Sequence, residues 1–238
     1  MKFLKSKLLR VLIILLLLAG IGCGIYLADF YHADTEAVAA FTADMQTRSD
    51  GNLVWSPENP VAGLIFYPGG KVDHTAYAPL MDALSARGIL CIVVKMPFHL
   101  AVLDMDAAAD LQAEFPQVEQ WYIGGHSLGG SMAAAYLGNC DEDYSGLILL
   151  AAYSTADLRQ TDLEVLSIYG SEDLVMDREN YEQYRQNLPA DFRELIIDGG
   201  CHAYFGMYGP QAGDGVPAIS NEDQIRYTAE AIAELVGG

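Results

Sequence analysis

Positively charged residues are scarce in this chain of 238 residues. Lysine and arginine together number 13, against 32 aspartates and glutamates, which gives a net charge of −19. Four of the basic residues and one of the acids lie in the first 30 positions, so the remainder carries a net charge of −22. Such a surface repels nucleic acid and anionic lipid headgroups, and no basic groove with interleaved aromatics is evident. We therefore expect no nucleic-acid partner.

Cysteine is also sparse. None of the four cysteines belongs to a C-x-x-C motif, so a zinc site or a redox motif has no support. A disulfide between Cys140 and Cys201 is possible, but the sequence gives no positive evidence for it. We find no internal repeat and no low-complexity tract. No metal ion and no organic cofactor is expected.

One long uncharged run stands near the N-terminus, over Val11–Ala28. As a helix it would rise about 27 Å, close to the roughly 30 Å hydrocarbon core of a bilayer. Basic residues precede the run, which by the positive-inside rule puts the N-terminus in the cytoplasm and the rest outside. We predict a transmembrane signal anchor over residues 1–30 and a single-pass protein of the cell membrane. The basic residues are Lys2, Lys5, Lys7 and Arg10.

Other interpretations of this segment fit less well. A cleaved signal peptide needs a small-x-small site after the apolar run, but the run continues past "GIGCG" into Ile25 and Leu27. A lipoprotein signal would use Cys23, yet Gly20 stands where that signal has an aliphatic residue. A buried core helix is disfavoured by the basic flank. Cleavage of the segment and lipidation at Cys23 stay open.

The remaining sequence changes pattern at about residue 51. Residues 31–50 predict a helical spacer, because Val38, Phe41 and Met45 recur at three- and four-residue steps. From residue 51 to 238, apolar runs alternate with amphipathic ones. The predicted strands are 53–56, 62–67, 89–95, 120–125, 146–152, 164–170 and 192–198. The predicted helices are 77–88, 103–115, 128–139, 177–188 and 221–236, the last with Ser220 at its N-cap.

This alternation predicts an α/β fold for residues 51–238. Strands that are apolar throughout suit a sheet covered on both faces. The strand–helix rhythm predicts a mostly parallel sheet with helices on both faces. In such sheets the ligand site lies beyond the carboxyl ends of the strands. Candidate site residues should therefore follow strands directly.

The segment Gly125–Gly129 reads Gly-His-Ser-Leu-Gly, the pattern G-x-S-x-G. Alone this is a hypothesis, but it stands between a predicted strand and a predicted helix, the context that a nucleophile elbow requires. Its glycines provide the small residues that this crowded turn needs, because they lack a Cβ. We predict Ser127 as the nucleophile and the Leu128 amide as one donor to the oxyanion. His126 is expected to point away from the position of the base.

A serine nucleophile needs a base, and the base needs a carboxylate. His202 follows the last predicted strand, 192–198, in a glycine-containing loop. In the chain order serine, acid, histidine the acid lies between the other two, and Asp173 follows the strand 164–170. We predict His202 as the base and Asp173 as its carboxylate. The alternatives for the acid are Glu172, Asp177 and, more weakly, Asp198.

A second oxyanion donor is expected from the loop after an early strand. The turn Pro68-Gly69-Gly70-Lys71 follows the strand 62–67 and lets its backbone approach a ligand closely. We predict the Gly70 amide as this donor, with Lys71 as the second choice. By its sign, the charge of Lys71 also suggests attraction for an anionic substrate group.

Four segments together, "YPGGKVD", "GGHSLGG", "YGSEDLV" and "GGCHAYFGMYGPQAGDG", resemble the α/β-hydrolase superfamily. More narrowly, the sequence is similar over roughly residues 52–236 to the compact bacterial fold-5 branch, which includes membrane-anchored members and is related to dienelactone hydrolases. The nucleophile of dienelactone hydrolases is a cysteine and here it is Ser127, which puts that specific activity in doubt. Only residues 153–163 separate two predicted strands where related enzymes carry a lid, so we expect an uncapped, open site. Tyr153, Met176 and Tyr204 are candidates for its rim.

The resemblance implies a membrane-tethered serine hydrolase, most simply a carboxylic ester hydrolase that takes a small-molecule acyl substrate and forms an acyl-enzyme. The same residues would also suit a thioesterase, a peptidase or an acyltransferase acting on envelope material. A non-catalytic scaffold protein of the same fold is the alternative outside enzymes. Fold alone does not choose among them.

Overall fold

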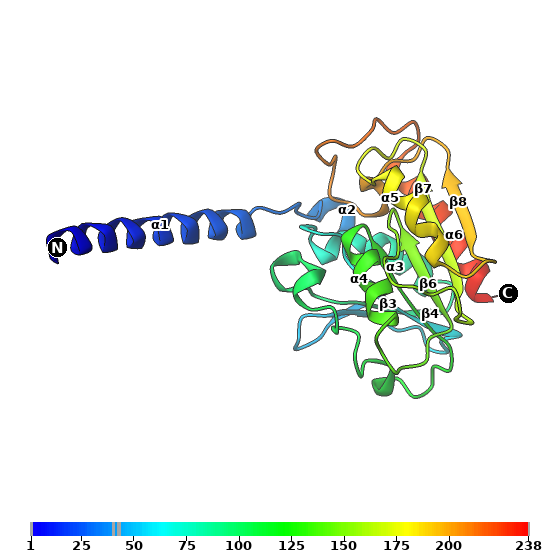
Figure 1. Cartoon of the computed structure of the whole chain (residues 1–238). Coiled ribbons are helices and arrows are strands. Elements are labelled where there is room, and N and C mark those ends of the chain that lie inside the picture. The colour runs from blue at the N-terminus through cyan, green and yellow to red at the C-terminus, as the bar shows by residue number, and fades with distance from the viewer. Residues whose placement is uncertain (1, 40, 42–43, 238) are drawn as a thin grey trace. The chain divides into compact units, whose positions relative to one another are not determined.

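The structure is a computed structural model of the chain, and it describes residues 2–39, 41 and 44–237 (Figure 1). The side chains of residues 2–11, 36 and 37 are outside this description. The chain divides into two compact units, Met1–Phe30 and Tyr31–Gly238. The first unit contains the helix α1 (Lys2–Ala28), so the predicted N-terminal helix is present.

The membrane-spanning role of α1 stays a prediction. In the part of the chain that the structure describes, no helix combines the length and the apolar character needed to cross a membrane. The side chains of the basic flank and of Val11 lie outside the described residues.

The second unit is built on one sheet of eight strands in the order β1-β2-β4-β3-β5-β6-β7-β8. At one edge, β2 (Leu53–Trp55) pairs antiparallel with both β1 (Met45–Thr47) and β4, and the pairs among the other six strands are all parallel. The mostly parallel sheet predicted from the alternation is therefore confirmed. The parallel strands are β3 (Ala62–Tyr67), β4 (Ile89–Val93), β5 (Trp121–His126), β6 (Gly146–Leu150), β7 (Glu164–Gly170) and β8 (Arg193–Ile197).

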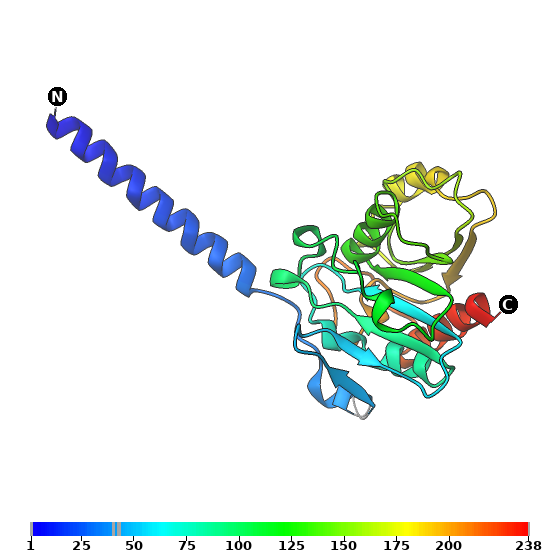
Figure 2. The same cartoon turned by 90° about the horizontal axis from the view of Figure 1, so that it is seen from below.

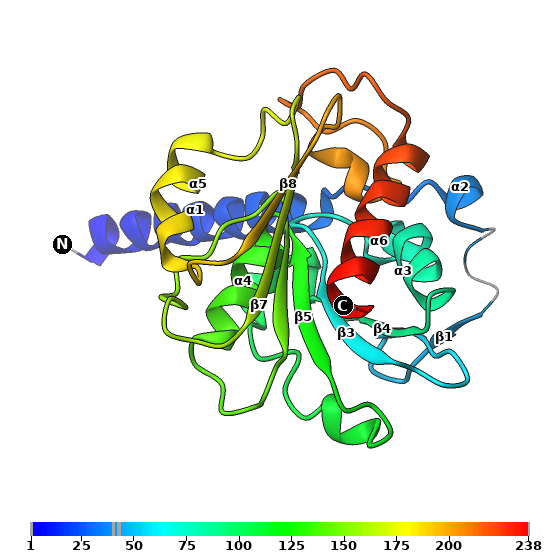
Figure 3. The ribbon, with the colours of Figure 1, turned by 90° about the vertical axis from the view of Figure 1, so that its right-hand side faces the viewer.

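Helices cover both faces of this sheet, as predicted (Figures 2 and 3). Successive strand side chains point to opposite faces, and the core follows this rule. Leu64 and Phe66 pack with α3 (Ala78–Ser85) and α6 (Asn221–Gly237), whereas Ile65 and Tyr67 pack on the face of α4 (Leu128–Leu137). Because both faces are buried, β3 is apolar along its whole length. The helix α5 (Arg178–Tyr184) follows β7.

The helical spacer predicted over residues 31–50 is only partly correct. A helix, α2, covers Thr35–Ala39, but Met45–Thr47 form the edge strand β1, which pairs with β2. Positions 40, 42 and 43 lie outside the described residues. Tyr31 makes a parallel bridge to Val72, and Ala33 is buried in the core. Strand pairing and burial thus override the helical spacing and join this segment to the sheet.

The helix predicted over residues 103–115 is wrong. Turns occupy residues 105–111, and a 3-10 turn follows at Gln112–Glu114. The buried Tyr67 hydroxyl donates to the Met105 carbonyl at 2.7 Å and accepts from the Ala108 amide at 2.9 Å. These bonds hold the backbone in a non-helical path, and aspartates such as Asp110, at φ 63°, tolerate such turns. The other 3-10 turns are His74–Tyr77, Pro97–His99, Ala101–Leu103, Arg185–Asn187 and Ala203–Phe205.

Three smaller points of the sequence analysis can also be compared with the structure. All four cysteines are free, so the open question of a Cys140–Cys201 disulfide is answered in the negative. Residues 151–163, between β6 and β7, contain no helix, in line with an uncapped site. The hydroxyl of Ser220 accepts the Asp223 amide at 3.1 Å, which confirms the predicted N-cap of α6.

Candidate active site

Ser127 stands at the sharp turn between β5 and α4. Its backbone lies at φ 52° and ψ −124°, a strained conformation for a residue with a side chain. Its amide donates to the Leu150 carbonyl at 2.8 Å, and its carbonyl accepts from the Ser131 amide at 3.1 Å. The turn is thereby tied to the end of β6 on one side and to the first turn of α4 on the other. The predicted strand–turn–helix context around Ser127 is confirmed.

The glycines of the motif are required by close backbone packing. A Cβ on Gly129 would lie 2.2 Å from the carbonyl oxygen of Pro68, and one on Gly125 would lie 2.5 Å from that of Tyr67. Backbone atoms cannot move aside as flexible side chains can. The elbow therefore packs directly on the turn that follows β3, which carries the other predicted oxyanion donor.

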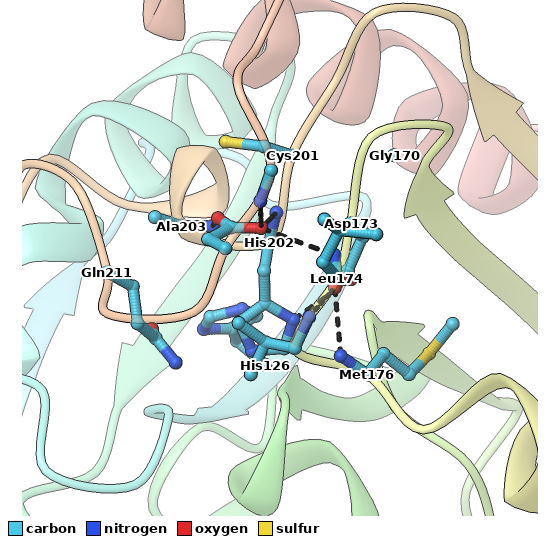
Figure 4. Close-up of polar contacts among 12 residues, drawn as sticks. His126, Gly170, Asp173, Leu174, Met176, Cys201, His202, Ala203 and Gln211 are labelled. Carbon is cyan, nitrogen blue, oxygen red and sulfur yellow. Dashed lines mark hydrogen bonds and ion pairs between the residues drawn. The ribbon is translucent and has the colours of Figure 1, made fainter.

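Asp173 and His202 form a buried pair at the carboxyl ends of β7 and β8 (Figure 4). Asp173 Oδ2 lies 2.9 Å from His202 Nδ1, and each residue is 1% exposed. Asp173 Oδ1 accepts the amides of Val175 and Met176, both at 2.9 Å, so the carboxylate cannot rotate away. An ionised carboxylate only accepts hydrogen bonds, which assigns the proton of the neutral ring to Nδ1. The other ring nitrogen, Nε2, is buried and has no partner within the described chain.

The alternative acids occupy other positions. Glu172 accepts a hydrogen bond from the Ser171 hydroxyl, and Asp177 accepts the Asn180 amide as the N-cap of α5. Asp198 is exposed at the end of β8. The structure thus brings Asp173, and not these three, to the ring of His202.

The geometry of the turn after β3 distinguishes between the two candidates for the second oxyanion donor. The Lys71 amide donates to the His99 carbonyl at 2.7 Å, so this second choice is already occupied. Gly70 faces the elbow, since a Cβ there would lie 3.0 Å from Leu128 Cδ2. Among the described residues the amides of Gly70 and Leu128 have no acceptor, which leaves both available to a ligand.

His126 does not point away from the base, and that expectation is wrong. Its ring centroid lies 4.6 Å from that of His202, and its Nδ1 lies 2.8 Å from the Tyr77 hydroxyl. The same hydroxyl accepts the Gly69 amide at 2.9 Å, so Tyr77 donates its own proton to His126. Burial lowers the pKa of His126 well below its ordinary value, and repulsion from His202 lowers it further. A neutral His126 therefore links the predicted oxyanion turn, Pro68-Gly69-Gly70-Lys71, to the ring of His202, the predicted base.

Asp214 is a site residue that the sequence analysis missed. Its carboxylate accepts the His202 amide at 3.1 Å and the Ala203 amide at 2.8 Å. It also lies 3.5 Å from the Leu174 amide, on the loop of Asp173. The next residue, Gly215, packs so closely that a Cβ would lie 1.9 Å from the Glu172 carbonyl oxygen. The glycine-rich segment after His202 was noted in the sequence, but only the fold shows that its Asp-Gly pair returns to these loops.

A cleft of about 380 Å³ opens beside Ser127, between α4 and the loops that follow β6 and β7. Two of the three rim candidates, Tyr153 and Met176, line it, and Tyr204 does not. The lining residues are Ser127, Leu128, Ser131, Met132, Ala151, Ala152, Tyr153, Thr155, Val175, Met176 and Asp177. Within the described chain, no group of three or more histidine, cysteine, aspartate or glutamate side chains is placed to hold a metal ion.

Sequence comparison matches residues 63–226, more than half of the chain, to the alpha/beta hydrolase family. The chain belongs to this family. A search of curated proteins finds no match. Many solved structures are similar to this alpha/beta hydrolase, and three of them illustrate the range.

The first is the esterase domain of a Rhodothermus marinus protein, with 16% identity, a TM-score of 0.57, and coverage of 80% of this chain and 95% of that one. The second is a soluble variant of monoglyceride lipase from Saccharomyces cerevisiae, with 13% identity, a TM-score of 0.57, and coverage of 81% and 93%. The third is a dienelactone hydrolase from Anabaena variabilis, with 14% identity, a TM-score of 0.57, and coverage of 81% and 97%. At these identities the likeness concerns the fold.

Proposed function

We propose that this alpha/beta hydrolase is a serine hydrolase that cleaves carboxylic esters of small molecules through an acyl-enzyme. The observation that carries the proposal is the buried Asp173–His202 pair, 2.9 Å apart, whose histidine ring lies 4.6 Å from that of His126, the residue before the strained elbow of Ser127. Esterases and a lipase among proteins of the same fold support an ester as the substrate.

In the proposed reaction the Ser127 hydroxyl attacks the acyl carbon while His202 Nε2 takes its proton. Asp173 holds the ring in the required tautomer and stabilises the imidazolium. The amides of Gly70 and Leu128 donate to the oxyanion of the tetrahedral intermediate. His202 returns the proton to the leaving alcohol, and the acyl group stays on Ser127. Water, activated by the same histidine, then releases the acid.

The test is covalent labelling of the full-length protein with an uncharged alkyl fluorophosphonate, together with hydrolysis of a short-chain ester. Wild-type protein should be labelled on Ser127, and Ser127→Ala should lose both labelling and turnover while it keeps its fold. Ser56→Ala, at an exposed serine on the rim of a separate cavity, is the matched control and should behave as wild type. Folded wild-type protein that takes no label would overturn the proposal and favour a scaffold role.

A thioesterase, a peptidase or an acyltransferase would use the same residues, so these activities are distinguished from an esterase by the substrate that is cleaved fastest. Acyl thioesters, peptides and an alcohol acceptor can be offered to the enzyme that has passed the labelling test. We expect the ester to have the highest kcat/KM. A thioester or peptide that is cleaved faster would reassign the substrate while the roles of Ser127, His202 and Asp173 stand.

We also propose that residues 1–30 tether the enzyme to the cell membrane, with the second unit on the extracytoplasmic side. The uncharged run Val11–Ala28 and the basic residues before it support this proposal. The full chain should stay with membranes after an alkaline carbonate wash, and Cys23→Ser should stay there too. Release of the full chain by the wash would refute the tether. Release of Cys23→Ser alone would assign it to lipidation.

A further inference from the structure

We infer that the cleft beside Ser127 takes an uncharged acyl group and rejects an acyl group that bears a carboxylate. The inference rests on the proposed function, since it concerns the acyl half of the same substrate. It follows from the charges and hydrogen bonds of the residues that line the cleft and of those that adjoin it.

The walls of the cleft are largely apolar. Six of the lining residues carry aliphatic or thioether side chains, and among the polar ones the Ser131 hydroxyl is already spent on the Tyr153 carbonyl, at 2.8 Å. The apolar residues are Leu128, Met132, Ala151, Ala152, Val175 and Met176. A carboxylate placed among them would lose part of its hydration, and the neutral hydroxyls of Tyr153 and Thr155 are the other lining donors that could replace it, so its burial is costly.

No lysine, arginine or histidine is among the residues that line the cleft. The adjacent Arg178 is engaged elsewhere, because it donates to the Gly170 carbonyl at 2.9 Å and stacks 4.1 Å above the Tyr169 ring. Lys71, whose charge suggested attraction for an anionic group, belongs to the turn after β3 and does not line this cleft. An anionic acyl group would thus find no cation to pair with.

The one charged lining residue has the wrong sign. Asp177 is fixed as the N-cap of α5, where Oδ1 accepts the Asn180 amide at 3.0 Å and Oδ2 accepts the Asn180 side-chain amide at 2.9 Å. Its carboxylate therefore stays at the cleft and repels a second carboxylate. Asp177 is exposed, so solvent weakens this repulsion, and across a few ångströms it corresponds to a severalfold change in rate. Loss of hydration adds to this effect.

The experiment compares three p-nitrophenyl esters with acyl groups of matched length: hexanoyl, 5-carbamoylpentanoyl and 5-carboxypentanoyl. The carbamoyl ester separates charge from polarity. We expect kcat/KM for the carboxyl ester to be about tenfold or more below that for the carbamoyl ester at low ionic strength, with a smaller ratio in high salt. A carboxyl ester cleaved within twofold of the carbamoyl ester would overturn the inference.

Two variants locate the effect in the cleft. Asp177→Asn keeps an N-cap residue. It should lower the ratio of kcat/KM for the carbamoyl ester to kcat/KM for the carboxyl ester severalfold. Thr155→Lys, at an exposed lining residue, should narrow it further because it supplies a cation. Asp162→Asn neutralises a carboxylate of a separate cavity and is the matched control, with an unchanged ratio. A ratio that stays constant in both cleft variants would also contradict the inference.

Fluorophosphonate labelling distinguishes a failure of the charge preference from a failure of the proposed function. Absence of fluorophosphonate labelling and of ester cleavage refutes the proposed function itself. Labelling with equal cleavage of the charged and uncharged esters refutes only the charge preference. If the protein is labelled but turns over none of the three esters, the rates of labelling by hexyl and 5-carboxypentyl fluorophosphonates make the same comparison. The hexyl probe should then react faster, and equal rates would refute the preference.

Discussion

The two halves of the site are held in place in different ways. The serine half is built from backbone: β5, α4 and the turn after β3 meet with so little space that Gly125 and Gly129 admit no side chain. The histidine half is built from side chains, since Asp173 holds the ring of His202 and Asp214 holds its backbone amide. A backbone-built turn is specified by the few residues that form it. A loop held by carboxylates depends on partners that lie far away in the sequence.

The largest effect is expected from the carboxylate of the histidine half. Asp173→Asn should keep the loop, because the amide oxygen can still accept from Val175 and Met176, but its NH₂ group would favour the wrong tautomer of His202. We expect kcat for ester hydrolysis to fall about 10³–10⁴-fold with little change in the unfolding midpoint. Asp198→Asn, at the exposed end of β8, should leave kcat unchanged. A loss smaller than tenfold in Asp173→Asn would assign the orienting role to another group.

A substitution in the serine half is expected to lower the free energy of unfolding. In Gly129→Ala the new methyl would lie 2.2 Å from the Pro68 oxygen and 2.3 Å from the Tyr67 oxygen, so the elbow and the oxyanion turn must separate. Overpacking of this kind costs about 1–3 kcal/mol, and we expect the upper end because both partners are backbone. Urea unfolding at pH 7.5 measures the loss. Gly237→Ala is the control, because a Cβ added there would meet no atom within 4 Å, and it should change stability by under about 0.5 kcal/mol.

The same contrast explains how far the sequence alone could predict the molecule. β3 and β7 match their predicted bounds, and the elbow was found because its signal is local. The segment of residues 103–115 was missed because a single buried hydroxyl, that of Tyr67, decides its path from 38 positions away. Asp214 and Tyr77 act on the site only through contacts that the fold creates, with the His202 amide and with His126. No spacing rule reports such contacts.

Asp214 tests whether side chains do position the histidine half. In Asp214→Ala the amides of His202 and Ala203 lose their acceptor, and we expect kcat to fall about 30- to 100-fold with KM nearly unchanged. Asp214→Asn keeps one acceptor oxygen and should recover part of the rate. Asp191→Ala, at an exposed carboxylate of a separate cavity, should match wild type. Loss of stability without this split between kcat and KM, or without partial recovery in the asparagine variant, would indicate a merely structural role.

A smaller effect is expected where the two halves meet. Tyr77→Phe removes both the acceptor of the Gly69 amide and the donor to His126 Nδ1, so the oxyanion turn loses one fixed point. We expect kcat to fall about tenfold, less than the loss of a direct oxyanion donor would cause. Tyr122→Phe removes a hydroxyl that donates to Glu164 at the opposite end of the strands and serves as the control. Unchanged kcat in Tyr77→Phe would show that glycine packing alone fixes the turn.

The smallest effect concerns pH and the buried His126. Its folded-state pKa is depressed by burial and by His202, whereas in the unfolded chain it titrates near its ordinary value of about 6.5. Above that pH neither state binds the proton and stability is unaffected. As pH falls below it, the unfolded state binds a proton that the folded state refuses, so stability falls with pH towards the folded pKa. His126→Asn, whose side chain can still accept from Tyr77, removes this dependence of stability on pH. Between pH 6.5 and 5.5 it should therefore lose about 1 kcal/mol less stability to urea than wild type. Parallel pH profiles for the two proteins would mean that His126 takes up its proton within the fold, and that the contact between the two halves does not require a neutral ring.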